Sequence, residues 1–270
     1  MRYKVLFIIV MLLNSCVTTH EFYTGSLATR YGINPFPGKE EWVNSIKQIS
    51  KKVNNNSRPA LLWNVGTYLK NGIKLSFPGK SESNNHYFTE IDLNSEYFKY
   101  FSNKKIDVFL IFEPGVADIS ETLKLILGNY SSYKSVKGIC IDLEWYDINK
   151  MVTKEEISKW LTVIHSYNPK YKLIIKHWNI NMIESFNNKN LIFLQNMDNI
   201  ENIDEFIKRY KLWARKFYPN RIGLKLGSDY KKMFDNLNNP TLEIYQTIKN
   251  ETNNSVSLFW SENVIFELSK

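Results

Sequence analysis

The segment Val136–Tyr146 (VKGICIDLEWY) constrains the fold of this chain more than any other segment. Alternation along a strand places apolar side chains on one face, at Ile139, Ile141 and Leu143. The opposite face carries Gly138, Cys140, Asp142 and Glu144. The apolar face needs a covering layer of helices, whereas burying two acids is costly unless they lie at the rim of a cavity. The carboxyl-terminal rim of a β/α barrel meets both demands, and active sites of that fold lie there.

Strand-like and amphipathic stretches alternate along the rest of the chain. The expected strands are Phe22–Leu27, Ala60–Val65, Asp107–Phe112, Gly138–Trp145, Leu173–His177, Leu191–Gln195, Ile222–Leu226 and Val256–Trp260. Acidic first turns and capping patterns predict helices at Trp42–Val53, Thr122–Leu127, Ile157–Tyr167, Phe206–Phe217 and from Pro240 toward Lys249. This order predicts an α/β fold, a single-domain (β/α)8 TIM-like barrel. A doubly wound open sheet is the alternative, but the glycine-rich turn that normally follows its first strand is missing.

One long polar segment interrupts the alternation. Lys70–Leu93 follows the second expected strand and contains Phe77-Pro78-Gly79 and Ser81–Asn85. We expect an extended loop over the carboxyl end of that strand, which is a suitable place for a substrate lid.

The amino terminus has the pattern of a signal peptide. Arg2 and Lys4 precede the apolar run Val5–Leu13, which is too short to span a bilayer. The run ends in Leu13-Asn14-Ser15-Cys16, which resembles the bacterial lipobox. That resemblance implies lipidation of Cys16 and an exported, membrane-anchored lipoprotein of the bacterial cell envelope. We therefore expect a signal peptide over 1–15, a lipidated tether over 16–21 and a barrel domain over 22–270; an ordinary cleaved signal peptide is the alternative.

The net charge and the cysteine and histidine content limit which ligands and covalent links the chain is expected to have. Removing residues 1–15 takes away Arg2 and Lys4 and lowers the formal charge from +8 to +6. The remaining excess is spread along the chain, which argues against nucleic-acid binding and leaves attraction to an anionic surface open. An acylated Cys16 cannot pair with Cys140, so we expect no disulfide, and Cys140 is expected to be a small buried filler. The four histidines form no ligand-spaced set, so neither a metal nor a cofactor is predicted.

Polar and aromatic residues follow the expected strands at the points where they end. These are the candidate substrate-binding residues: Glu113, His177, Trp178, Gln195, Asp198, Lys225 and Trp260. Because the carboxyl ends of parallel strands share one rim, we expect these side chains around one cavity. Each also has a structural interpretation, such as packing for the two tryptophans or a backbone hydrogen bond for His177.

The central strand resembles the signature of family-18 glycoside hydrolases, the chitinase group, in which a glycine-containing strand ends in Asp-x-Asp-x-Glu. The family's glycine falls on Gly138, its last aspartate on Asp142 and its catalytic glutamate on Glu144, whereas its two earlier acids fall on Lys137 and Cys140. Trp260 is placed like the last-strand tryptophan that forms the floor of the sugar subsite. The pattern is also similar to uncharacterised secreted barrel domains with an Asp-x-Glu-Trp-Tyr strand and a later Lys-His-Trp.

Glu144 is the expected general acid, and Asp142 is expected to tune it. A glycosidic oxygen leaves only when protonated, and two neighbouring carboxylates resist ionising together, which raises one pKa. The usual mechanism needs a second carboxylate, and the candidates are Glu113, Asp198 and Glu262. A purely structural role is the alternative, in which Asp142 and Glu144 pair with Lys176 or Lys225.

Three functions remain open from the sequence. The first is a lipid-anchored, glycoside-hydrolase-like protein that acts on a polysaccharide or oligosaccharide through Glu144. The second is a non-catalytic lipoprotein that binds a glycan or a protein partner on a degenerate hydrolase barrel. The incomplete acidic motif favours this second function. The third is a structural envelope protein, which the crowded polar strand ends argue against.

Overall fold

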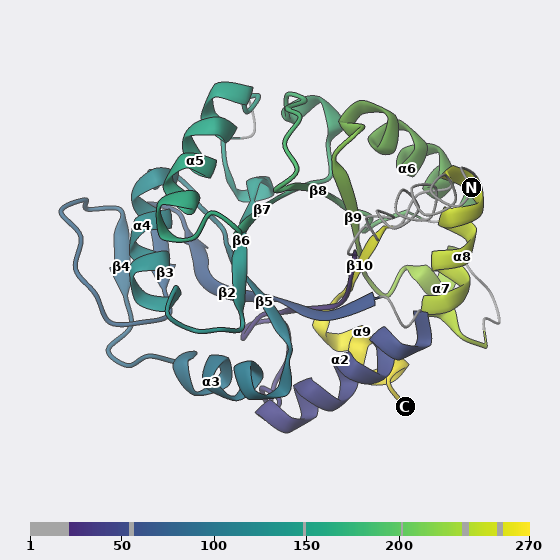
Figure 1. The fold of residues 1–270 in the computed structure, drawn as a ribbon, viewed down its shortest axis with the longest axis horizontal. Coiled ribbons are helices and arrows are strands. Elements are labelled where there is room, and N and C mark those ends of the chain that lie inside the picture. The colour runs from purple at the N-terminus through teal and green to yellow at the C-terminus, as the bar shows by residue number, and fades with distance from the viewer. Residues whose placement is uncertain (1–21, 54–56, 148–149, 201, 234–237, 253–255) are drawn as a thin grey trace, which may run out of the picture.

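The computed structural model describes residues 22–53, 57–147, 150–200, 202–233, 238–252 and 256–270 (Figure 1). The predicted signal peptide, Cys16 and the tether all lie outside the described residues. In the described part of the chain, no helix is both long enough and apolar enough to cross a bilayer.

Eight parallel strands close into a barrel, which confirms the predicted α/β, single-domain TIM-like fold. Around the barrel they are β1 (Phe22–Ala28), β2 (Ser57–Leu69), β5 (Asp107–Phe112), β6 (Val136–Asp142), β7 (Lys172–His177), β8 (Leu191–Asn196), β9 (Arg221–Leu226) and β10 (Ser257–Trp260). β1 pairs in parallel with both β10 and β2, so the sheet closes on itself. This closure rules out the open sheet that was the alternative.

Helices surround the barrel on its outer side (Figure 1). They are α2 (Lys39–Val53), α3 (Ser95–Lys104), α4 (Ile119–Tyr130), α5 (Lys154–Tyr167), α6 (Ile203–Phe217), α7 (Tyr230–Met233), α8 (Pro240–Thr252) and α9 (Glu262–Leu268). The capping pattern before α5 forms as expected, because Thr153 and Glu156 each accept a hydrogen bond from the other's backbone N–H. The short helices α3, α7 and α9 were not predicted.

The core consists of two layers separated by the sheet. A small inner cluster fills the barrel and contains Cys140, Ile174, Leu194 and Phe259. A larger outer cluster, which includes Ile139 and Ile141, lies between the strands and the helices. The alternation predicted for β6 therefore holds, with its apolar face against the helices and Cys140 buried inside the barrel.

The structure corrects two local predictions. In Lys70–Leu93, β3 (Gly72–Leu75) pairs antiparallel with the end of β2, and β4 (His86–Phe88) pairs with β3, so much of the expected lid is a sheet extension. The strand expected to continue to Trp145 ends at Asp142, and a 3₁₀ turn, η2 (Leu143–Trp145), follows it. The Asp142 carboxylate accepts a hydrogen bond from the backbone N–H of Glu144 (3.3 Å), which favours the turn over a continued strand.

Substituting Gly138 should destabilise the barrel. A Cβ at this position would lie 1.9 Å from the carbonyl oxygen of Lys172 on β7, and the φ angle of +153° disfavours other residues. We expect Gly138→Ala to lower the free energy of unfolding by roughly 1–3 kcal/mol. Gly128 is the matched control, because it lies in α4 and a Cβ there would meet only the Tyr167 hydroxyl, at an ordinary contact distance of 3.8 Å. Gly128→Ala should instead raise stability by about 0.5–1 kcal/mol. Thermal unfolding of both variants checks the pair, and equal effects would contradict the argument.

Candidate active site

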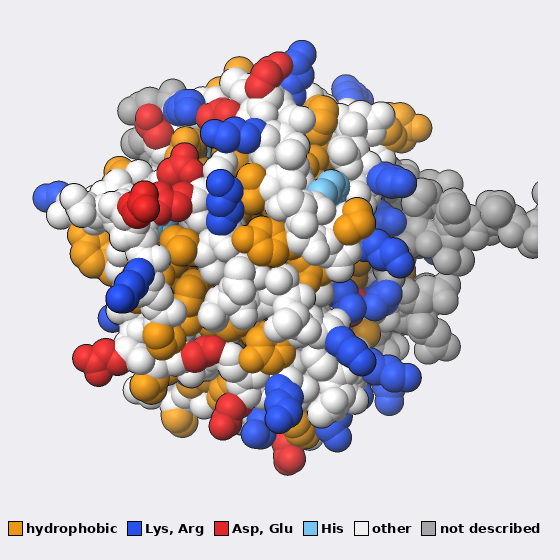
Figure 2. All heavy atoms as spheres, turned by 60° about the vertical axis from the view of Figure 1, so that its left-hand side comes forward, with side chains coloured by type: hydrophobic (Ala, Val, Ile, Leu, Met, Phe, Trp, Pro, Cys, Tyr) orange, Lys and Arg blue, Asp and Glu red, His pale blue; other side chains and the backbone are white. Residues whose placement is uncertain are grey.

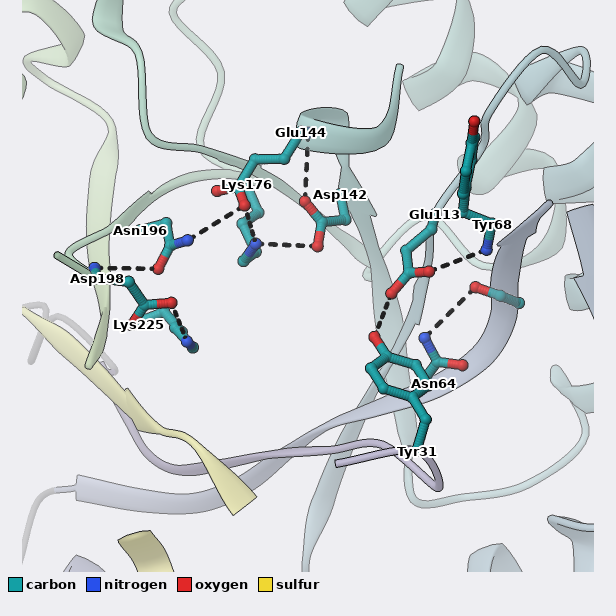
Figure 3. Close-up of polar contacts among 11 residues, drawn as sticks. Tyr31, Asn64, Tyr68, Glu113, Asp142, Glu144, Lys176, Asn196, Asp198 and Lys225 are labelled. Atoms are coloured by element: carbon teal, nitrogen blue, oxygen red, sulfur yellow. Dashed lines mark hydrogen bonds and ion pairs between the residues drawn. The ribbon is translucent and has the colours of Figure 1, made fainter. Parts of the chain in front are cut away.

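An ion-pair triad occupies the carboxyl-terminal mouth of the barrel. Lys176 projects from the end of β7, and its Nζ lies 2.9 Å from Asp142 Oδ2 and 3.0 Å from Glu144 Oε2. Asp142 is the last residue of β6, and the turn that follows carries Glu144 over the same lysine (Figure 3). The structure thus joins both predicted catalytic residues to the lysine proposed as their structural partner.

The triad continues into a second group of polar side chains. The Asn196 amide, at the end of β8, donates to Glu144 Oε2 at 3.1 Å. Asn196 Oδ1 accepts from the backbone N–H of Asp198 at 3.4 Å, and Asp198 pairs with Lys225 of β9 at 2.5 Å. Four neighbouring strands therefore contribute to one connected network along the rim (Figure 3).

Glu113 lies on the other side of the same rim. It directly follows β5 and is 4% exposed. Its carboxylate accepts hydrogen bonds from the Tyr31 hydroxyl and from the backbone N–H of Tyr68, the latter at 2.9 Å. No ion pair to Glu113 is found among the described residues, although the charge of Lys176 opposes the effect of burial on its pKa, and its carboxylate points toward the barrel interior (Figure 3). Of the three predicted second carboxylates, Glu113 lies across the rim from the triad (Figure 3), Asp198 is paired with Lys225, and Glu262 accepts from Thr29.

Burial shifts the protonation equilibria of these groups. It raises the pKa of Glu113 above its ordinary value, and the hydrogen bonds from Tyr31 and Tyr68 oppose this shift. Burial also raises the pKa of Glu144, which the positive charge of Lys176 opposes and the negative charge of Asp142 reinforces. Asp142 and Glu144 outweigh the burial of Lys176 and hold its pKa above the ordinary value, so the lysine is charged.

One oxygen of Glu144 is left without a protein partner. Its Oε2 contacts Lys176 and Asn196, whereas its Oε1 is buried and accepts no hydrogen bond among the described residues. A buried carboxylate oxygen without a partner is costly, which is consistent with the way burial raises the pKa of Glu144.

Exposed aromatic rings lie beside these carboxylates. The Tyr68 ring stacks on Trp145, with ring centroids 5.2 Å apart, and both rings are partly exposed. Tyr31 is 62% exposed although its hydroxyl contacts Glu113, and the predicted Trp178 is 55% exposed just beyond β7. Exposed aromatic faces beside carboxylates are suited to the apolar C–H faces of sugars.

Three predicted binding residues make no hydrogen bond to the network among the described contacts. Gln195 falls on the strand face that packs on the helices, and its neighbour Asn196 takes the inward position. His177 is buried beside Trp178, and its Nδ1 accepts the backbone N–H of Asn179 at 2.8 Å. Trp260 is fully buried in the outer core against Tyr230, so it does not offer its face to a sugar. The residue that faces the barrel interior on β10 is Phe259.

The structure also shows where Glu262 and Cys140, two further residues considered from the sequence, lie. Glu262 accepts a hydrogen bond from Thr29 near the start of α9, away from the triad contacts. Burial holds the pKa of the Cys140 thiol well above its ordinary value, so the thiol is protonated.

No cluster of three or more metal-ligating side chains occurs among the residues that the structure describes. Sequence reasoning did not identify Tyr31 and Tyr68, which approach Glu113 from distant segments.

Comparison with known proteins supports the fold. No family model and no curated protein matches this chain. Among solved structures, it is similar to a fucosyltransferase mutant of the α-L-fucosidase AlfC, with 11% identity, a TM-score of 0.50, and coverage of 90% of this chain and 80% of that one. It is also similar to UMP synthase of Leishmania donovani (8% identity, TM-score 0.44), covering 91% of this chain and 49% of that protein. The first likeness shows that the chain shares the barrel fold of a glycosidase, whereas the resemblance to family 18 stays a prediction.

Proposed function

We propose that the mouth of this barrel binds a carbohydrate and hydrolyses a glycosidic bond in it. The observation that carries the proposal is the grouping of Glu113, Asp142 and Glu144, all largely buried, on the inner rim. Only one lysine of the described residues, Lys176, lies among these three carboxylates. Three negative charges would exceed its single positive charge, which favours protonation of one carboxylate. The fold shared with a fucosidase supports the proposal only at the level of the barrel, because one fold carries many activities.

In the proposed mechanism Glu144 protonates the leaving glycosidic oxygen. Its Oε1 accepts no hydrogen bond among the described residues, so we assign the acidic proton to this oxygen. Asp142 and Lys176 orient the carboxyl group and set its pKa. Glu113, across the rim, supplies the second carboxylate that activates water or stabilises the developing positive charge.

A screen of oligosaccharides tests this function. The protein is incubated with panels of N-acetylated and neutral oligosaccharides, and binding and cleavage are measured separately. Cleavage of any member with release of a reducing end supports hydrolysis. Failure to bind any sugar would contradict both the hydrolase and the glycan-binding proposals.

A specific contact favours a second function, glycan binding without cleavage. Lys176 lies 3.0 Å from Glu144, and a cation so close stabilises the ionised carboxylate, which has no proton to donate. Binding without cleavage across the whole panel would support this function. The same rim residues and exposed rings would then serve recognition alone.

We also propose that the protein is an exported lipoprotein anchored through Cys16. The support is sequence-based: a charged amino terminus, an apolar run and Leu13-Asn14-Ser15-Cys16. Several acyl chains on one residue hold a protein firmly at a membrane, whereas a single chain binds only marginally. Mass spectrometry of the mature amino terminus should find an acylated Cys16. A mature chain that starts elsewhere would contradict the anchor.

A further inference from the structure

The end of the barrel opposite the mouth, where the strands begin, has a basic hollow. Its volume is about 600 Å³, and its lining combines one acid, Asp107, with five cationic side chains, those of Arg58, Lys134, Lys137, Lys170 and Lys172. Asp107 is buried and lies 2.7 Å from Arg58 and 4.0 Å from Lys137. The hollow therefore keeps a net positive charge.

A second basic hollow adjoins the first. Its volume is about 490 Å³, and it is lined by Lys47, Lys51, Lys104 and Lys105 together with Ser57 and Pro59. Ser57 and Pro59 flank Arg58, so the two hollows meet at the start of β2. We call the surface formed by both hollows the basic face. In Figure 2 the right-hand side carries many Lys and Arg side chains and hardly any acidic ones, while the acids gather on the left.

Helix ends explain only part of this charge. Cations in the last turn of a helix are favoured by its dipole, and Lys51 and Lys104 are such residues. Lys134 and Lys170 instead lie in the connections between helices and strands, and Lys137 and Lys172 lie within the first residues of β6 and β7. No last-turn effect accounts for those positions. Their concentration at one end of the barrel indicates a surface for an anionic partner.

The position of β1 indicates which anionic partner lies near the basic face. β1 begins at Phe22 and runs parallel to its neighbours, so its first residues lie at the basic face, where Tyr23 lines the first hollow. Cys16 precedes Phe22 by six residues, a length that spans roughly 20 Å when fully extended. An anchor at Cys16 would therefore hold the basic face within a few Debye lengths of the bilayer, where charge attraction acts.

We propose that the basic face docks onto the anionic phospholipid surface of the membrane that carries the anchor. Lipid phosphates lie between the lysines of the two hollows, and the carboxylate-lined mouth points away from the bilayer. This orientation rests on the proposed anchor at Cys16. It makes the mouth accessible to a glycan outside the membrane and keeps its negative charge away from the lipid headgroups.

Vesicle binding tests the proposal without the anchor. A chain of residues 17–270 lacks Cys16 and retains the described barrel, whose closing strand β1 pairs with β10 and β2 through Phe22–Ala28. We expect it to co-sediment with vesicles of equimolar phosphatidylcholine and phosphatidylglycerol at low salt and to dissociate from them as the salt concentration rises. It should not bind vesicles of pure phosphatidylcholine.

Matched triple variants identify the surface. Lys51, Lys134 and Lys170 are exposed on the basic face, and changing all three to Gln should weaken vesicle binding by roughly a hundredfold. The control changes the exposed Lys74, Lys80 and Lys159, which line neither hollow, and it alters net charge equally. Its binding should stay near that of the parent chain.

Three results would overturn the proposal: no binding to anionic vesicles, equal losses in both triple variants, or binding of a soluble sulfated polysaccharide through the same lysines without any binding to vesicles. The assayed chain carries no lipid. A failure to bind vesicles would therefore contradict the docking proposal alone, and the acylation of Cys16 and the cleavage of oligosaccharides would still be tested by their own experiments.

Discussion

Glu144→Gln is expected to abolish most cleavage while leaving sugar binding intact. The amide keeps the size of the side chain and an oxygen to accept from Lys176 and Asn196, but it has no acidic proton. Loss of a general acid typically lowers the rate on the order of 10²–10⁴-fold. Initial rates of oligosaccharide cleavage, measured beside binding by calorimetry, check this expectation.

Two further variants make this test specific. Glu155→Gln alters an exposed glutamate in the first turn of α5 and should leave the rate unchanged. Asp142→Asn removes a negative charge that raises the pKa of Glu144, so the high-pH limb of the rate profile should move to lower pH. If Glu144→Gln cleaves as fast as the parent protein, another residue is the acid.

Lys176→Met is expected to cause the largest loss of stability of any single substitution in the rim. It leaves Asp142 and Glu144 buried beside each other with no cation between them. Removing one partner of a buried ion pair typically costs about 3–5 kcal/mol, which corresponds to roughly 10 °C in Tm for a domain of this size. Lys225→Met is the comparison, because its partner Asp198 is more exposed and the loss should be smaller.

The pH dependence of Lys176→Met gives a second measurement. Without the lysine, whose positive charge opposes the effect of burial, the folded-state pKa of Glu144 rises further above its unfolded value. A raised carboxyl pKa destabilises the fold at neutral pH, and the loss is recovered as pH falls through that pKa. The Tm deficit of the variant should therefore shrink between pH 7 and pH 5. Combining Lys176→Met with Asp142→Asn and Glu144→Gln should also restore stability, and a triple variant as unstable as Lys176→Met would contradict this explanation.

The sequence predicted the barrel because its local signals agree with one another. Acids in first turns mark where α2, α5 and α6 begin, and apolar runs mark the strands between them. The alternation in β6 was informative because Gly138 and Asp142 interrupt the apolar pattern on one face only. α9 was missed because seven residues give too few turns to show a helical period, whereas the apolar face of α3, Phe98 and Phe101, was a signal that went unused.

The candidate site was predicted less completely for a related reason. β8 reads LIFLQN and β10 reads SLFW. Both faces of such strands are buried, so polar and apolar residues do not alternate along them and the sequence does not mark which face is inward. The sequence therefore does not indicate that Asn196 faces inward while Gln195 and Trp260 face the helices. Tyr31 and Tyr68 reach Glu113 only through the tertiary fold, from segments far away in the chain.

A crystal structure of Glu144→Gln soaked with an oligosaccharide from the binding screen tests the central claim most directly. We predict that an intact sugar lies across the mouth, with its glycosidic oxygen at the side chain of residue 144 and Glu113 on the opposite side of the bond. Exposed rings of the rim, Trp145 and Tyr68 among them, should contact the sugar faces. A sugar bound at the opposite end of the barrel, or bound beyond reach of residue 144, would contradict the account.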